Sequence, residues 1–138
     1  MTTARDIMHV GATCIGENET LASAAQRMRD LDVGALPICG EDDRLRGILT
    51  DRDIVIKCVA EGGDPQTITA SEYAQGAPVT VDAGAQVASV LQTMEEHRVR
   101  RLPVLDDRRL IGMISEADLA RGLPEEAVGQ FVEAICAR

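Results

Sequence analysis

The chain has 138 residues, 45% of them apolar, which is enough for one compact domain or for two small halves that share a core. Tyr73 and Phe131 are its only aromatic residues, so the core must be aliphatic, and ring platforms for stacking single-stranded nucleic acid are excluded. The net charge of −9 also argues against a nucleic acid partner, because phosphate backbones repel an acidic surface.

Membrane and export signals are not visible in the sequence. No apolar stretch approaches the roughly 20 residues that a bilayer-spanning helix needs. The first residues, Met1 to Asp6, lack a basic region followed by an apolar one, which a secretory signal would require. We therefore expect a cytoplasmic protein with no membrane partner.

The first half of the chain predicts alternating helices and strands. Thr3 can cap a short helix, with Asp6 at its third position. A helix whose apolar residues recur on one face then separates two strands, which should be parallel because a helix joins them. The expected elements are a helix at 4–8, a strand at 13–15, a helix at about 21–31, a strand ending at 36–38, its hairpin partner at 45–50 and a second helix from Asp51.

The second half repeats this order after a crossover that includes Gly62 to Pro65. The elements expected there are a helical start near Ser71, a strand at 79–81, a helix around 87–94, a strand ending at 102–104, its partner at 110–115 and a helix from Glu116. After Pro124 a last amphipathic helix carries an apolar stripe. That stripe must pack on its own domain or on a neighbouring subunit.

The two halves are copies of one unit. At an offset of 66 residues, identities between 4–38 and 70–104 include Leu36-Pro37 on Leu102-Pro103, and at an offset of 65 Asp53 matches Asp118. Units this small bury too little surface alone, so the copies must share a core. We expect a mixed α+β fold with repeats at 4–61 and 70–122, a crossover at 62–69 and a C-terminal helix at 124–137.

Two motifs in each repeat resemble the CBS-domain signature, in which a Leu-Pro-Val type strand end precedes Gly-aliphatic-aliphatic-Thr-x-x-Asp. The matching segments are 35–38 with 47–53, and 101–104 with 112–118, and the resemblance extends from residue 4 to about 121. It implies tandem βαββα repeats related by a pseudo-two-fold axis, forming a free-standing, non-enzymatic regulatory module. It also implies a homodimer, a stress-related role, an unidentified protein partner and an adenosine-type ligand: AMP, ADP, ATP or S-adenosylmethionine.

The resemblance also implies which residues bind the ligand. Each site combines the base slot of one repeat with the Ser/Thr-x-x-Asp of the other, where an Asp carboxylate can accept from both ribose hydroxyls. One site comprises Thr13, Val33, Gly34, Ser115 and Asp118; the other comprises Val79, Val99, Arg100, Thr50 and Asp53. In the alternative, these hydroxyls and carboxylates serve only as helix caps, and Arg100 only fills its cleft.

The four cysteines show no CxxC spacing. Cys14 and Cys39 fall at corresponding points of neighbouring strands, where a disulfide is conceivable and two buried free thiols are the alternative. Cys136 could join His97 or His9 in binding zinc, but ligands so scattered lead us to expect no zinc. The competing function is a stress-response interaction or redox protein with closed clefts, stabilised by a Cys14–Cys39 bond or a metal, that binds no nucleotide. No arrangement of nucleophile and base predicts an enzyme.

Overall fold

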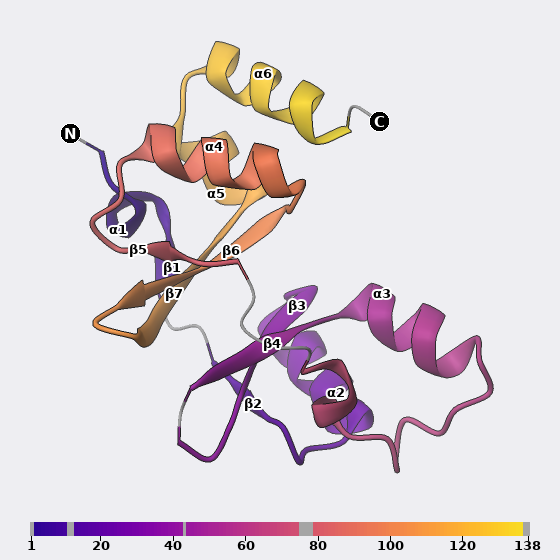
Figure 1. Ribbon diagram of the computed structural model, residues 1–138. Coiled ribbons are helices and arrows are strands. Elements are labelled where there is room, and N and C mark those ends of the chain that lie inside the picture. The colour runs from indigo at the N-terminus through magenta and orange to yellow at the C-terminus, as the bar shows by residue number, and fades with distance from the viewer. Residues whose placement is uncertain (1, 11–12, 43, 75–78, 137–138) are drawn as a thin grey trace. The chain divides into compact units, whose positions relative to one another are not determined.

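The computed structural model describes residues 2–10, 13–42, 44–74 and 79–136, with only the backbone at Cys136, and it divides into two compact units (Figure 1). Unit 1 consists of Met1–Ala12 with Val79–Arg138, and unit 2 consists of Thr13–Pro78. Unit 1 holds a four-stranded sheet and unit 2 a three-stranded sheet. The fold is therefore mixed α/β, as the repeated pattern predicts. None of the helices in the described ranges is long and apolar enough to cross a membrane.

Unit 2 is built around a sheet with the order β2-β3-β4. Its elements are β2 (Ile15–Gly16), α2 (Leu21–Leu31), β3 (Ala35–Cys39), β4 (Leu45–Thr50), α3 (Asp51–Asp53), η1 (Ile54–Val59) and η2 (Ala70–Tyr73). As predicted from the helix that joins them, β2 and β3 are parallel, and β4 returns antiparallel. The Thr20 hydroxyl accepts the Ser23 amide and so begins α2. Leu21, Leu36 and Leu49 are among the buried aliphatic residues of the core.

The helix expected from Asp51 has two parts. α3 makes one short turn, and η1 continues it as a π-helix in which the Ala60 amide donates to the Val55 carbonyl, five residues back. Ile54 and Cys58, four residues apart on η1, are buried. The apolar side chains of Val55, Ile56 and Val59 are exposed.

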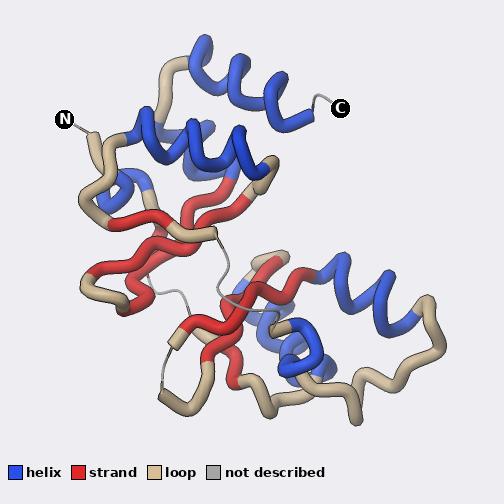
Figure 2. Tube along the Cα trace, viewed as in Figure 1, coloured by secondary structure: helices blue, strands red, loops and turns tan. Residues whose placement is uncertain are grey.

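Unit 1 has the sheet order β1-β7-β6-β5. Its elements are α1 (Ala4–Ile7), β1 (His9–Val10), β5 (Val81–Asp82), α4 (Val87–His97), β6 (Arg101–Asp106), β7 (Arg109–Ser115), α5 (Glu116–Gly122) and α6 (Glu125–Cys136). β5 and β6 are parallel, and β7 runs antiparallel to both β6 and β1 (strands red in Figure 2). In both repeats the first strand begins two residues later than predicted, at Ile15 and Val81.

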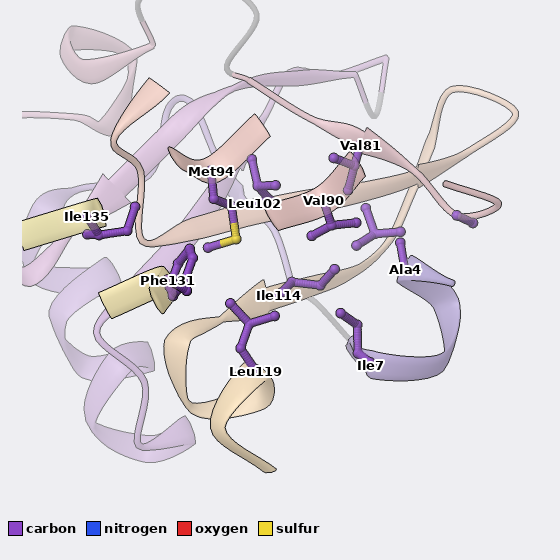
Figure 3. Packing of buried hydrophobic residues seen from close by; sticks show 12 residues of the cluster. Ala4, Ile7, Val81, Val90, Met94, Leu102, Ile114, Leu119, Phe131 and Ile135 are labelled. Carbon is purple, nitrogen blue, oxygen red and sulfur yellow. The ribbon is translucent and has the colours of Figure 1, made fainter. Parts of the chain in front are cut away.

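The C-terminal helix α6 packs on its own unit. Phe131 and Ile135 are 1% and 6% exposed and belong to one buried cluster with Met94 and Leu119 (Figure 3). Of the two partners expected for its apolar stripe, the structure therefore shows the chain's own unit. The large ring of Phe131 fills a core that is otherwise aliphatic.

The units of packing do not follow the repeats of the sequence. α1 opens the first repeat but packs in unit 1, where the Ala4 amide donates to the Ala85 carbonyl at 2.8 Å. η2 opens the second repeat but packs in unit 2, where the Ala70 amide donates to the Glu19 carbonyl at 2.9 Å. Ala4 and Ala70, identical residues at the 66-residue offset, are both fully buried. Each repeat thus contributes its opening turn to the unit formed by the other.

Candidate functional site

The Thr50-x-x-Asp53 motif of unit 2 lies where β4 ends and α3 begins. The Thr50 amide donates to Asp53 Oδ2 at 3.1 Å, and the Asp53 amide donates to Thr50 Oγ1 at 3.0 Å, which is a reciprocal capping box. The other carboxylate oxygen, Oδ1, lies 3.2 Å from Lys57 Nζ. The Asp53 side chain is 20% exposed and that of Lys57 is 57% exposed. One oxygen of Asp53 is therefore paired with a flexible surface lysine.

The backbone amides at the start of α3 are already used within the chain. The Asp51 amide donates to the Gly34 carbonyl at 2.9 Å, and the Arg52 amide donates to Asp51 Oδ1 at 2.8 Å. With the Asp53 amide on Thr50, each of these three donors has an acceptor. A phosphate at this point would have to displace one of these acceptors or use the Lys57 ammonium instead.

Tyr73 adds a ring to this side of unit 2. Lys57 Nζ lies 6.0 Å from the centre of the Tyr73 ring, at the outer limit of a cation–π contact. Burial raises the pKa of the Tyr73 phenol, with smaller contributions from Cys58, Glu72 and Asp53. The phenol therefore stays protonated at neutral pH and can act as a hydrogen-bond donor.

The Ser115-x-x-Asp118 motif of unit 1 makes the same capping box at the junction of β7 and α5. Asp118 Oδ2 accepts from the Ser115 amide at 2.8 Å and from the Ser115 hydroxyl at 3.0 Å. His9 Nδ1 lies 2.7 Å from the same oxygen, and Arg121 meets Oδ1 at 2.6 Å. The Asp118 side chain is only 3% exposed. Three of these donors converge on Oδ2 and one meets Oδ1, and all four come from unit 1.

The hydrogen bonds on Asp118 outweigh its burial. Burial raises the pKa of a carboxyl group, yet donation from His9 and from the hydroxyl and amide of Ser115 holds the pKa of Asp118 below its ordinary value. Asp118 is therefore ionised at neutral pH. Because an ionised carboxylate only accepts hydrogen bonds, the His9 imidazole must donate through Nδ1.

The remaining predicted ligand-binding residues are divided between the units. Thr13, Val33 and Gly34 lie in unit 2, and Val79, Val99 and Arg100 lie in unit 1. Within unit 2 the structure joins Gly34 to the start of α3 through the Asp51 amide. Within unit 1 it brings Arg100 Nε to 3.7 Å from Glu116 Oε1, next to Ser115. Both predicted sites combine residues of the two units, so these combinations stay predictions.

Cys14 and Cys39 form a disulfide with their Cα atoms 5.6 Å apart. It joins the residue before β2 to the last residue of β3, and the Arg27 guanidinium donates to the Cys14 carbonyl at 2.9 Å beside it. Cys58 is a buried free thiol. The Cys136 side chain lies outside the described residues, His97 is exposed, and His9 is bonded to Asp118. The part of the chain that the structure describes contains no group of three or more His, Cys, Asp or Glu residues able to hold a metal.

Three partners of the motif carboxylates were not among the expected ligand-binding residues. Lys57 follows Asp53 by four residues and Arg121 follows Asp118 by three, so the helical spacing of opposite charges could have identified both. His9 is 109 residues away from Asp118 in the sequence. No local pattern connects these two residues, and only the pairing of β1 with β7 brings them together.

Comparison with known proteins gives the family. The CBS domain family model matches residues 4–59 and 70–125. Hypoxic response protein 1 of Mycobacterium tuberculosis is 62% identical over 136 residues, which cover 99% of this chain and 95% of that protein. The CBS domain-containing protein YhcV of Bacillus subtilis is 35% identical over 120 residues, covering 87% of this chain and 84% of that protein.

One solved structure corrects an expectation from the sequence. The crystal structure of hypoxic response protein I with two coordinated zinc ions matches this chain with a TM-score of 0.81 and 61% identity, covering 89% of this chain and 100% of that chain. The expectation that zinc would play no part is therefore wrong for a protein this similar. It rested on the scattered positions of Cys136, His97 and His9 along one chain, and sequence spacing does not measure distance in a folded protein. Two CBS repeats span most of the sequence, and the chain belongs to the CBS domain family.

Proposed function

We propose that this CBS pair is a non-enzymatic regulatory module that binds an adenosine-type ligand: AMP, ADP, ATP or S-adenosylmethionine. Asp53 is the residue that carries the proposal. Its Oδ1 faces the flexible ammonium of Lys57, while its Oδ2 caps the Thr50 amide. An Asp carboxylate can accept hydrogen bonds from both ribose hydroxyls, and Lys57, once released, is a cation for a phosphate.

The other residues of the proposed sites follow the family pattern. Val79, Val99 and Arg100 would form the base side of the site that contains Thr50 and Asp53. Thr13, Val33 and Gly34 would do so for the site that contains Ser115 and Asp118. A ligand that binds one arrangement of the repeats better than another shifts the population toward it, and this shift is the signal a partner protein reads. The identity with hypoxic response protein 1 supports a role under stress.

A thermal-shift titration with the four adenosyl compounds tests this function. We expect the unfolding temperature to rise with at least one of them, because a ligand that binds only the folded state stabilises it. Asp53→Asn should abolish the part of the rise that belongs to its own site, since the amide keeps the cap on Thr50 but lacks the negative charge that favours hydrogen bonds from the ribose hydroxyls. Asp51→Asn is the matched control, because the neighbouring Asp51 carboxylate accepts a hydrogen bond from the Arg52 amide and is not part of the proposed site. No response to any of the compounds at millimolar concentration would contradict the proposal.

We also propose that the chain forms a homodimer through η1. Val55, Ile56 and Val59 are 55%, 45% and 56% exposed on a single helix, which is an apolar surface suited to a second copy. Val59→Glu should shift the molecular mass measured by light scattering toward the monomer. Leu31→Glu, at an isolated exposed apolar position on α2, should leave the mass unchanged. A monomeric wild-type protein would contradict the dimer.

Zinc binding is a second proposed function, supported by the two coordinated zinc ions of the 61%-identical hypoxic response protein I. The described residues form no group of three ligands, so the ion would need side chains outside them or from a second copy. Metal analysis of protein purified without chelator tests this directly. Zinc below one tenth of the chain concentration would contradict it, whatever the result with adenosyl compounds.

A further inference from the structure

The N-terminal strand places a histidine on the carboxylate of the second repeat. Asp118 accepts from the Ser115 amide, the Ser115 hydroxyl, His9 and Arg121, and its side chain is 3% exposed. A carboxylate has about four acceptor positions. Three of these donors converge on Oδ2 and Arg121 takes one position of Oδ1, so a ribose diol that uses both carboxylate oxygens can bind only after Oδ2 has been vacated.

Arg121 and His9 differ in how firmly they are held. The Arg121 side chain is 70% exposed and pairs with Asp118 three residues back on the same helix, so it can swing into water at little cost. His9 is held by its backbone, which pairs with Met113 in β7. Just before it, Ala4 and Ile7 of α1 are buried in the core of unit 1. Departure of Arg121 frees Oδ1 only. On Oδ2 the Ser115 donors belong to the helix cap, so the His9 imidazole, although 45% exposed, is the partner that a diol using both oxygens would have to displace.

Gly112 of β7 shows how closely β1 approaches this strand. A Cβ atom at Gly112 would lie 2.8 Å from the His9 carbonyl oxygen and 2.5 Å from the Met8 sulfur. Only a glycine in β7 lets β1 approach this closely. The position of His9 is thus fixed by packing on both sides of it, not only by its bond to Asp118.

The first repeat gives its carboxylate a different set of partners. At the 66-residue offset His9 corresponds to Gln75, which lies outside the described residues, and at the 65-residue offset Arg121 corresponds to Ile56. The sequence thus has a neutral amide in place of the imidazole and an apolar side chain in place of the guanidinium. The Asp53 side chain is 20% exposed, and its ion-pair partner is a flexible surface lysine. The carboxylate of the first repeat is therefore less enclosed than that of the second.

We propose that His9 is a built-in occupant of the Asp118 carboxylate, so that the chain's own N-terminal strand closes this half of the module and competes with any diol ligand for Asp118. The proposal rests on the proposed adenosyl function and refines it: the module binds one ligand per chain, at Asp53. Loss of the His9 contact opens a second site. A partner that pulls β1 away from β7 would have the same effect.

Calorimetric titration with AMP and with S-adenosylmethionine tests the competition. For the wild type we expect about one bound molecule per chain, and for Asp53→Asn almost none. In the Asp53→Asn background, His9→Ala should raise the affinity about fivefold to tenfold, in line with the removal of a hydrogen bond to a charged group whose donor is partly exposed. His9→Asn, whose amide can replace the Nδ1 donor, should leave the site closed. His9→Asn thereby serves as the matched control for His9→Ala.

Two outcomes of the titration would overturn the proposal while the adenosyl function stands. One is two bound molecules per wild-type chain, with Asp118→Asn removing one of them. The other is an unchanged affinity when His9→Ala is added to Asp53→Asn.

Hydrogen exchange gives a readout that needs no ligand. His9→Ala should speed exchange of the backbone amides in residues 4–10 several-fold, and His9→Asn, which keeps a donor to Asp118, should not. If neither compound binds any variant, the adenosyl function fails, and exchange alone decides whether His9 anchors the strand. Equal exchange rates in wild type and His9→Ala would then overturn the proposal.

Discussion

The two Ser/Thr-x-x-Asp motifs have the same local structure and different surroundings. Both close a capping box at a strand-to-helix junction. In unit 2 the Asp53 side chain remains 20% exposed beside a flexible lysine, whereas in unit 1 Asp118 is 3% exposed and has a histidine and an arginine as further partners. The motif thus specifies a helix start, and residues outside the motif determine how exposed its carboxylate remains and which groups it contacts.

The two units also differ in covalent cross-linking. Only unit 2 has a disulfide among the described residues, and Cys14 and Cys39 are 25 residues apart in the sequence. A loop of this size corresponds to about 3.5 kcal/mol of unfolding free energy in the chain-entropy model. Cys14→Ser with Cys39→Ser should therefore speed amide exchange in β2 and β3 strongly and leave β6 and β7 unchanged. Equal acceleration in both units would show that the disulfide stabilises the whole chain and not one half.

Removing the Asp118 carboxylate should lower the unfolding free energy more than removing the Asp53 carboxylate. Asp118→Ala should lower the unfolding free energy by about 2 kcal/mol, because it removes a cap and also the contact that ties β1 to α5. Asp53→Ala removes a cap beside a surface ion pair and should lower it by about 1 kcal/mol. Urea unfolding measures both values. Equal losses would mean that His9 and Arg121 add nothing to stability.

The lowered pKa of Asp118 predicts that acid lowers the unfolding free energy through a group in unit 1. Its pKa in the folded state lies below the ordinary value of 3.8, so the ionised carboxylate contributes stability that is fully present above about pH 4 and is lost as the pH falls through the folded pKa. The unfolding free energy of the wild type should therefore fall more steeply below pH 4 than that of Asp118→Asn. Parallel pH curves for the two proteins would contradict this assignment.

The smallest predicted change in stability concerns the C-terminal ends of α2 and α4. Asp32 ends α2 and Arg98 ends α4, both with left-handed backbones, at φ 55° and φ 52°. Glycine adopts this conformation without strain, and aspartate tolerates it better than arginine does. Arg98→Gly should therefore raise the unfolding free energy by up to about 1 kcal/mol, and Asp32→Gly by less. A greater gain at Asp32 would mean that the Arg98 side chain has a stabilising contact of its own.

Much of the local structure could be predicted from the sequence. The duplication, the alternation of helices and strands and the parallel pairing of the first two strands follow from periodicity and from the helix between them. The prediction missed the π-helical winding of η1, because apolar periodicity does not distinguish five-residue from four-residue hydrogen bonding. Both first strands were placed two residues too early, since short strands lack sharp end signals. The role of α6 was left open, because an apolar stripe does not reveal its partner.

By itself, the sequence determined that this protein is a duplicated CBS pair and that each repeat places a Ser/Thr-x-x-Asp at a helix start. The motifs depend on residues a few positions apart and the duplication on matches at a fixed offset, so spacing along the chain reveals both, and the CBS family follows from the resemblance of the motifs. The tertiary structure alone decided that α1 and η2 each pack with the opposite repeat, and that His9 reaches Asp118 across 109 residues of sequence. Such contacts depend on which strand edges and helix faces meet after folding. Sequence patterns over a few residues do not reveal these tertiary contacts. The contacts give Asp53 and Asp118 different surroundings.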